Sequence, residues 1–235
     1  MLVCLRAIMR ITWSVFVLFL LADMNVSYAQ QTIFNVPNQD VLAPGQVYGE
    51  IDVPFRITEP KFVAVTPRVV IGLGADFEGG VNLPGYISSG DPLLWTAVVA
   101  LKHGNTLDDS GSWTMTEGVH GYFPLTKGPD AGIFGYAMLG KKFSNGIRIS
   151  GGIYGATKAV TGTTSAIGAL GAIEVPLNNW LTFATDAYSG ANSLGYISPG
   201  VAIIPFENAA IYAAYQFSNA TSDADSFLIE LGYTF

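Results

Sequence analysis

The last nine residues of the chain alternate strictly between two kinds of side chain. One set is apolar and rich in aromatics: Phe227, Ile229, Leu231, Tyr233 and Phe235. The intervening set includes a carboxylate, Glu230, and a glycine, Gly232. Successive side chains of a β-strand point to opposite faces, so this pattern predicts a strand with one apolar face and one face of polar or small residues.

A strand of this kind that ends on Phe235 resembles the closing strand of bacterial outer-membrane β-barrels. In that family the terminal aromatic residue and the alternate apolar residues before it form an assembly signal. The resemblance covers this one strand. It implies that the apolar set acts as the signal, and that membrane lipid and the barrel-assembly machinery are partners of the chain.

The beginning of the chain is typical of a secretory signal peptide. Arg6 and Arg10 precede an apolar stretch over 11–22, and small residues follow at Ser27 and Ala29. This order predicts cleavage after Ala29 and export of the chain. A retained N-terminal membrane helix is the alternative, although the stretch is short for spanning a bilayer.

Composition narrows the possible functions of the exported part. The one cysteine, Cys4, lies inside the signal, so no disulfide is expected. Removal of Arg6, Arg10 and Asp23 leaves 9 of the 11 basic and 17 of the 18 acidic residues, a net charge of -8. This charge argues against nucleic acid as a partner.

The chain is strongly hydrophobic, yet its sequence predicts no membrane-spanning helix after the signal. Half of the residues are hydrophobic and 12% are charged. The longest uncharged run after the signal, residues 187–206, is interrupted by glycine and proline, which a spanning helix would avoid. High hydropathy without a helical span is expected of a transmembrane β-barrel, because only every second residue meets lipid.

Strand patterns recur from Val47 to the end of the chain. We count about twelve, with 10–14 possible, and twelve satisfies the even number found in bacterial barrels. Tight connections are expected at 74–76, 144–146, 178–179 and 207–208, and they alternate with longer ones at 84–92, 156–163, 189–195 and 219–225. The connections at 58–61 and 103–112 break this rule.

The predicted architecture is therefore all-β: a closed, antiparallel, up-and-down transmembrane barrel over 47–235. Residues 1–29 are the cleaved signal peptide, and 30–46 are a periplasmic or lumenal segment, or a disordered lead-in. A soluble β-sandwich would also alternate, but its outward faces would carry charge. Several of the predicted outward faces of this chain carry no charged residue. The expected location is the outer membrane of a Gram-negative bacterium.

The charged residues of the strands are expected to line the lumen: Glu50, Asp52, Arg56, Arg68, Glu78, Arg148, Glu174, Asp186 and Glu230. An excess of acids in a water-filled lumen predicts a passive channel for small polar solutes with a slight preference for cations. The alternative is a non-conducting structural or surface-interaction barrel whose lumen is crosslinked by ion pairs, with arginine bridging carboxylates.

Catalysis is not expected, and a barrel-borne hydrolase is the least favoured hypothesis. His103 is expected in a turn and His120 on an inward face, but no spacing assembles a nucleophile, a base and an orienting group. No zinc spacing or phosphate-binding motif is present, so no metal and no cofactor are expected. Glu117 is unexplained, because its position in the alternation would place it toward lipid; either it lies near an interface or a bulge shifts the register there.

Overall fold

The computed structural model describes residues 32–87, 94–126, 130–164, 166–220 and 225–235. These residues contain 13 strand segments and one short helix, α2 (Lys158–Thr161). The strands are β1 (Val47–Arg56), β2 (Phe62–Gly74), β3 (Phe77–Asn82), β4 (Gly85–Ile87), β5 (Leu94–Thr106), β6 (Trp113–Pro124), β7 (Gly132–Lys142), β8 (Arg148–Ala156), β9 (Ala166–Pro176), β10 (Leu181–Tyr188), β11 (Tyr196–Phe206), β12 (Ala209–Ser218) and β13 (Ser226–Thr234).

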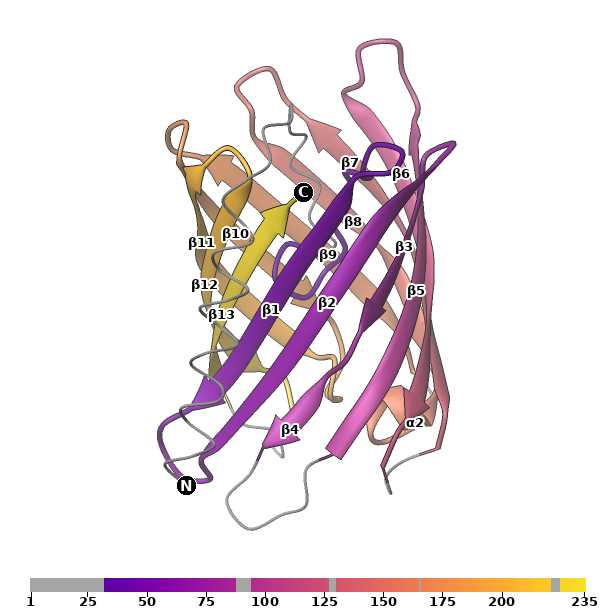
Figure 1. The fold of residues 1–235 in the computed structure, drawn as a ribbon, viewed down its shortest axis with the longest axis vertical. Helices are drawn as coiled ribbons and strands as arrows, with labels where there is room; N and C mark the ends of the chain where they lie inside the picture. The colour runs from indigo at the N-terminus through magenta and orange to yellow at the C-terminus, as the bar shows by residue number, and fades with distance from the viewer. Residues whose placement is uncertain (1–31, 88–93, 127–129, 165, 221–224) are drawn as a thin grey trace.

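The strands form one antiparallel sheet that closes on itself. Each strand pairs with its sequence neighbours, and β1 pairs with both β2 and β13, from Tyr48 opposite Thr234 to Phe55 opposite Phe227. The segments β3 and β4 both pair with β2 and β5, so they form one strand interrupted at Leu83 and Pro84. The prediction of a closed, up-and-down barrel of about twelve strands is confirmed (Figure 1).

Alternation sorts the side chains of the strands onto the two faces of the barrel. Odd-numbered positions point outward and carry exposed apolar side chains, such as Val69, Val99, Leu139, Ile153 and Leu231. Even-numbered positions point inward. The outer surface is thus the apolar face that a lipid bilayer requires, and closure satisfies the backbone hydrogen bonds that an open edge would leave unpaired.

The two ends of the barrel differ in the length of their connections. One end, here the turn end, carries 75–76, 107–112, 143–147, 177–180 and 207–208. The other, the loop end, carries the described connections 57–61, 157–164 and 189–195, with α2 in the second of these. The four tight turns predicted from the sequence all lie at the turn end.

One connection was placed wrongly from the sequence. His103 was expected in a turn over 103–112, but β5 continues to Thr106, and His103 pairs with Glu117 of β6. The β5–β6 ladder has no register shift between Thr96 and Thr106, so a bulge does not explain the outward position of Glu117. Its carboxylate lies 3.4 Å from His103 Nδ1 on the outer face.

Residues 32–46 enter the barrel before β1 begins, and we call them the lumenal segment. Ile33, Phe34, Val36 and Leu42 are at most 4% exposed. In Figure 1 the indigo trace of this segment loops inside the wall behind β1 and β2. The predicted signal peptide, residues 1–29, lies outside the described residues. No described helix has both the length and the apolar character needed to cross a bilayer.

Candidate functional site: the barrel lumen and its N-terminal segment

One carboxylate of β10 anchors the start of the lumenal segment. Asp186 Oδ2 accepts hydrogen bonds from the backbone N–H groups of Phe34, Asn35 and Val36 at 3.0, 2.6 and 2.7 Å. The segment turns tightly here, with Ile33 N–H donating to the carbonyl of Val36 at 2.8 Å. An ionised acceptor roughly doubles the strength of such bonds, so Asp186 is the strongest polar attachment of this turn.

An arginine of β8 holds the middle of the segment. Arg148 donates from Nη1 and Nη2 to the two carboxylate oxygens of Asp40, at 2.6 and 2.7 Å. Glu174 of β9 lies 4.0 Å from the same guanidinium. This two-pronged geometry fixes the orientation of Asp40 as well as its position.

A buried lysine of β5 binds the segment through its backbone. Lys102, 2% exposed, donates to the carbonyls of Asn38 at 3.2 Å and Asp40 at 2.7 Å. Its ammonium group also lies 2.8 Å from Glu78 Oε1. The other oxygen of Glu78 accepts from Leu42 N–H at 3.0 Å. The ion pair of Lys102 and Glu78 therefore binds both backbone N–H and backbone carbonyl groups of the lumenal segment.

Glycines of the wall make room for this segment. A Cβ added to Gly72 of β2 would lie 2.1 Å from the carbonyl oxygen of Ala43. At Gly140 of β7 it would lie 1.3 Å from the side chain of Gln39. Gly72 is therefore required for the close approach of the backbone of the segment, whereas at Gly140 the flexible side chain of Gln39 would have to move.

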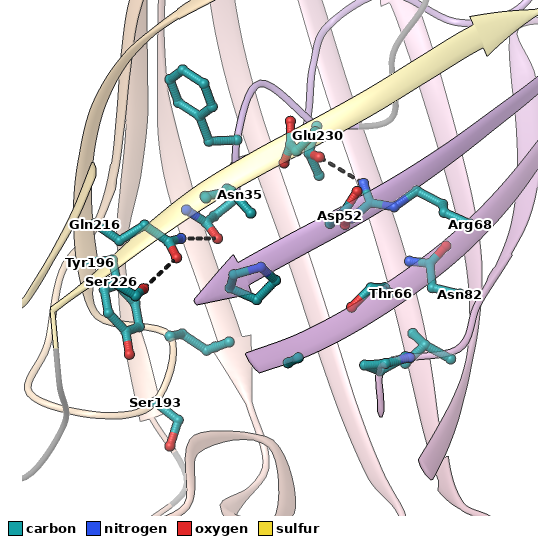
Figure 2. A pocket seen from close by; sticks show the side chains of 18 of the residues that line it. Asn35, Asp52, Thr66, Arg68, Asn82, Ser193, Tyr196, Gln216, Ser226 and Glu230 are labelled. Carbon is teal, nitrogen blue, oxygen red and sulfur yellow. Dashed lines mark hydrogen bonds and ion pairs between the residues drawn. The ribbon is translucent and has the colours of Figure 1, made fainter. Parts of the chain in front are cut away.

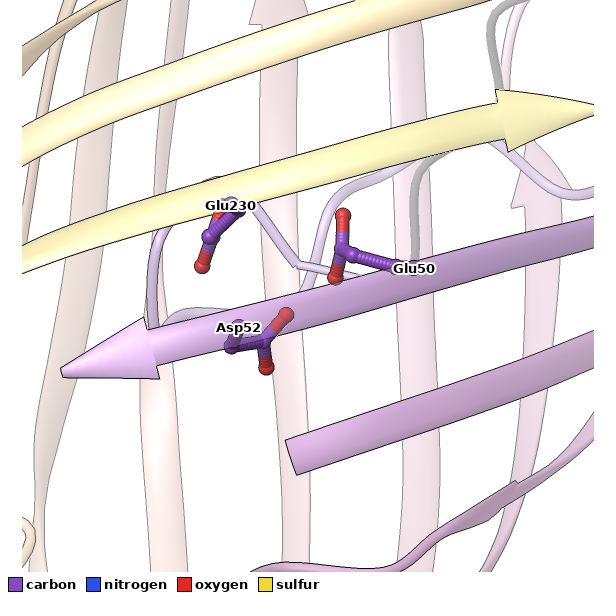
Figure 3. Close-up of side chains that lie close together, drawn as sticks. All are labelled: Glu50, Asp52 and Glu230. Carbon is purple, nitrogen blue, oxygen red and sulfur yellow. The ribbon is translucent and has the colours of Figure 1, made fainter. Parts of the chain in front are cut away.

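A cluster of three acids and one arginine lies on the inner face where the barrel closes. Arg68 of β2 pairs with Glu50 at 3.2 Å and with Asp52 at 2.5 Å, and it donates to Thr32 Oγ1 of the lumenal segment at 2.7 Å. Glu230 of β13 faces the two acids of β1 (Figure 3), and carboxylate oxygens of the three acids lie within 4.8 Å of one another.

Two cavities of the described barrel lie on opposite sides of the lumenal segment. The larger, about 750 Å³, reaches the loop end, where Pro60, Pro84 and Ser193 line it. The smaller, about 310 Å³, lies toward the turn end beside Asp76 and Ser112. Thr32, Phe34 and Asn35 line the first, whereas Gln39, Asp40 and Val41 line the second. Residues 32–41 thus stand between the two cavities.

The charged residues expected in the lumen occupy the inner face but not a single cluster. Six are at most 8% exposed: Glu50, Asp52, Arg68, Glu78, Asp186 and Glu230. Arg148 and Glu174 are partly buried beside Asp40. Arg56 differs, because it lies at the loop end, where its Nε donates to Thr58 Oγ1 at 3.0 Å. The apolar residues of the expected assembly signal, Phe227 to Phe235, lie on the outer face.

Two charged residues of the site were missed from the sequence. Lys102 could have been found, because it follows Leu101 in an alternating stretch and so shares the inward face. The misplaced turn at 103 ended that strand four residues too early, since β5 continues to Thr106. Asp40 lies in a segment without periodicity, and no pattern there indicates the direction of a side chain.

Among the described residues, no catalytic set comes together around either histidine. His120 lies on the inner face of β6, where its ring is 5.3 Å from that of Phe134, and no described residue hydrogen-bonds to it. His103 lies on the outer face, stacked on Phe77 at 4.4 Å. Among the described residues the group best suited to hold a metal is Glu50, Asp52 and Glu230. Arg68 already binds two of these three carboxylates.

Comparison with known proteins yields similarity in structure alone. No family model and no curated protein matches the chain. An outer membrane channel from Pseudomonas putida F1 is 10% identical, with a TM-score of 0.48, over 84% of this chain and 98% of that one. The translocator domain of the autotransporter NalP from Neisseria meningitidis is 10% identical, with a TM-score of 0.40, over 84% and 90%. No functional conclusion follows from similarities this low.

Proposed function

We propose that the chain forms a channel for small polar solutes in the bacterial outer membrane, with a slight preference for cations. The observation that supports it most directly is the width of the lumen. The lumen holds residues 32–46 of the chain and still leaves cavities of about 750 and 310 Å³ on either side of them. In this conformation the lumenal segment closes the passage, so solute flow requires its displacement.

The apolar outer face and the closed sheet support the proposed location in the outer membrane. Export through a cleaved signal of residues 1–29 remains part of this proposal. The outward aromatic and aliphatic residues of β13, ending on Phe235, remain the proposed signal for the barrel-assembly machinery.

The channel is tested by removing the lumenal segment. We expect the mature chain in planar bilayers to pass current only in rare openings. A variant that lacks residues 30–43 should conduct continuously and ohmically, because its two cavities join. Residues 45 and 46 are kept, since they pair with Gly72 of β2. Circular dichroism and heat-dependent mobility on gels confirm that the variant is folded.

A synthetic peptide of residues 32–43 is the matched control, because it should restore closure when added to the shortened variant. A folded variant that insulates the bilayer would contradict the proposal. It would favour the second candidate, a non-conducting structural barrel. That candidate is supported by the ion pairs that hold the segment, above all Arg148 with Asp40 and Lys102 with Glu78.

A further inference from the structure

We propose that the larger cavity is a binding site for a small, neutral aromatic compound that carries a hydroxyl group. The inference deepens the proposed channel by naming one class of its solutes, and it rests on that function only for transport. Binding itself can be measured without current, so the two proposals can fail separately.

Two polar side chains of β6 line the larger cavity without a hydrogen-bond partner among the described residues. They are His120, which is 9% exposed, and Tyr122, which is partly buried and lies two positions further along the same inward face. Buried polar groups in proteins normally have partners, so their absence beside a cavity points to a ligand. A hydroxyl group fits, because it can accept from the imidazole N–H and donate to the Tyr122 oxygen.

Polar side chains elsewhere in the wall already bind one another. Gln216 Nε2 donates to Asn35 Oδ1 at 3.0 Å, and Gln216 Oε1 accepts from Ser226 Oγ at 2.9 Å (Figure 2). These three side chains therefore gain little from a ligand. His120 and Tyr122 differ from them in this respect, so the polar end of the ligand is expected at β6.

Aromatic rings lie next to the unpaired groups of β6. Phe134 of β7 is opposite His120 in the β6–β7 ladder, and the two rings are 5.3 Å apart. Tyr188 lies 6.0 Å from Phe134 at an interplanar angle of 69°, and both line the cavity together with Phe34 of the lumenal segment. An aromatic ligand can extend such a set by offset or edge-to-face contacts. The volume of about 750 Å³ lies within the range of small-molecule sites.

The position of the charged residues favours a neutral ligand. Arg68 and Asp52, which also line the cavity, bind each other at 2.5 Å near the closure of the barrel between β1 and β13. A ligand held by β6 and β7 leaves this ion pair intact. An ionised ligand there would lie among aromatic side chains without a charged partner, and burial of an unpaired charge is costly.

The test uses the two histidines of the chain as reporters. The mature chain, with isotope-labelled histidine, is refolded in detergent and titrated with benzyl alcohol while the imidazole signals are followed by NMR. We expect a saturable shift of the His120 signal and none of the His103 signal, because His103 lies on the outer face. Benzylamine and benzoate, which are charged at neutral pH, should bind more weakly.

Tyr122→Phe tests the role of the ligand hydroxyl and keeps His120 as the reporter. Loss of one hydrogen bond should weaken benzyl alcohol about fivefold and leave the affinity for toluene unchanged. Tyr215→Phe is the matched control, because it removes a hydroxyl on the outer face, where Tyr215 packs against Phe217 and Phe227, and should change neither affinity.

Several results would overturn the proposal. The first is a His120 signal that does not respond, or one that shifts no more than that of His103, as partitioning into detergent would produce. Tighter binding of benzylamine or benzoate would exclude a neutral ligand. Equal effects of Tyr122→Phe on benzyl alcohol and toluene would exclude recognition of the hydroxyl. None of these results would bear on conduction by the shortened variant.

Discussion

At the scale of single residues, the lumen contains side chains that each satisfy several backbone groups. Asp186 is the clearest case, because one of its oxygens accepts three consecutive N–H groups of the lumenal segment. Such groups have no other partner in a buried turn, and an unsatisfied buried N–H costs about 1–3 kcal/mol. The segment is therefore positioned by a few strong polar attachments together with the buried apolar contacts of Ile33, Phe34, Val36 and Leu42.

Asp186→Ala should release the start of the segment. Loss of the three bonds is expected to weaken docking by about 2 kcal/mol, which shifts the ratio of closed to open channels roughly 30-fold. Open probability in planar bilayers measures this shift. Asp225→Ala is the control, because Asp225 accepts one backbone N–H, from Ser218, at the loop end. Identical open probabilities for Asp186→Ala and the parent chain would exclude this anchoring role.

At the scale of elements, the lumenal segment packs closely against the wall where a strand carries glycine. Gly72 lies where β2 meets residues 42–46, and it exchanges backbone hydrogen bonds with Gly45 and Gln46 at 2.8 and 3.0 Å. The carbonyl of Ala43 occupies the space where a Cβ would be. Neither backbone can move far without breaking the pairing of β2 with β1 or β3.

Gly72→Ala should displace the segment while the barrel stays closed. The new Cβ would lie 2.1 Å from a backbone oxygen, so the segment must shift, and we expect more frequent openings than in the parent chain. Single-channel recording provides the measurement. Gly155→Ala is the matched control, because a Cβ there meets nothing within 4 Å. Unchanged gating in Gly72→Ala would show that the segment tolerates the added methyl group.

At the scale of the whole molecule, the barrel separates an apolar exterior from an acidic interior. The inner face of the strands carries six acids, Glu50, Asp52, Glu78, Glu174, Asp186 and Glu230. It carries five basic residues, Arg68, Lys102 and Arg148 in the middle, Arg56 at the loop end and Lys142 at the turn end. A lumen with this excess attracts cations and repels anions, and salt screens the effect.

The variant that lacks residues 30–43 should therefore prefer K⁺ over Cl⁻. In a KCl gradient the reversal potential should shift toward that of K⁺, and the shift should shrink as total salt rises. Glu78→Gln in the same background should reduce the selectivity. Glu117→Gln should leave it unchanged, because this carboxylate lies on the outer face. Anion preference in the shortened variant would contradict the assignment of the lumen.

The sequence by itself determined which side of each strand is apolar and faces outward, and that the sheet closes. Alternation assigns every residue of a strand to one of two faces, whatever its neighbours are, and apolar faces in lipid leave closure as the way to satisfy the backbone. The same rule places Lys102 inward. It fails only where the end of a strand is misjudged, as at His103.

Only the tertiary structure decided what the inward side chains bind and where residues 32–46 lie. Asp40 and Arg148 are 108 positions apart, and Asp186 binds backbone groups about 150 positions away. Such partners depend on the shear and diameter of the closed sheet, which a single strand does not encode. The lumenal segment has no period that would assign it a face, so its place was set by the space and the charges of the finished barrel.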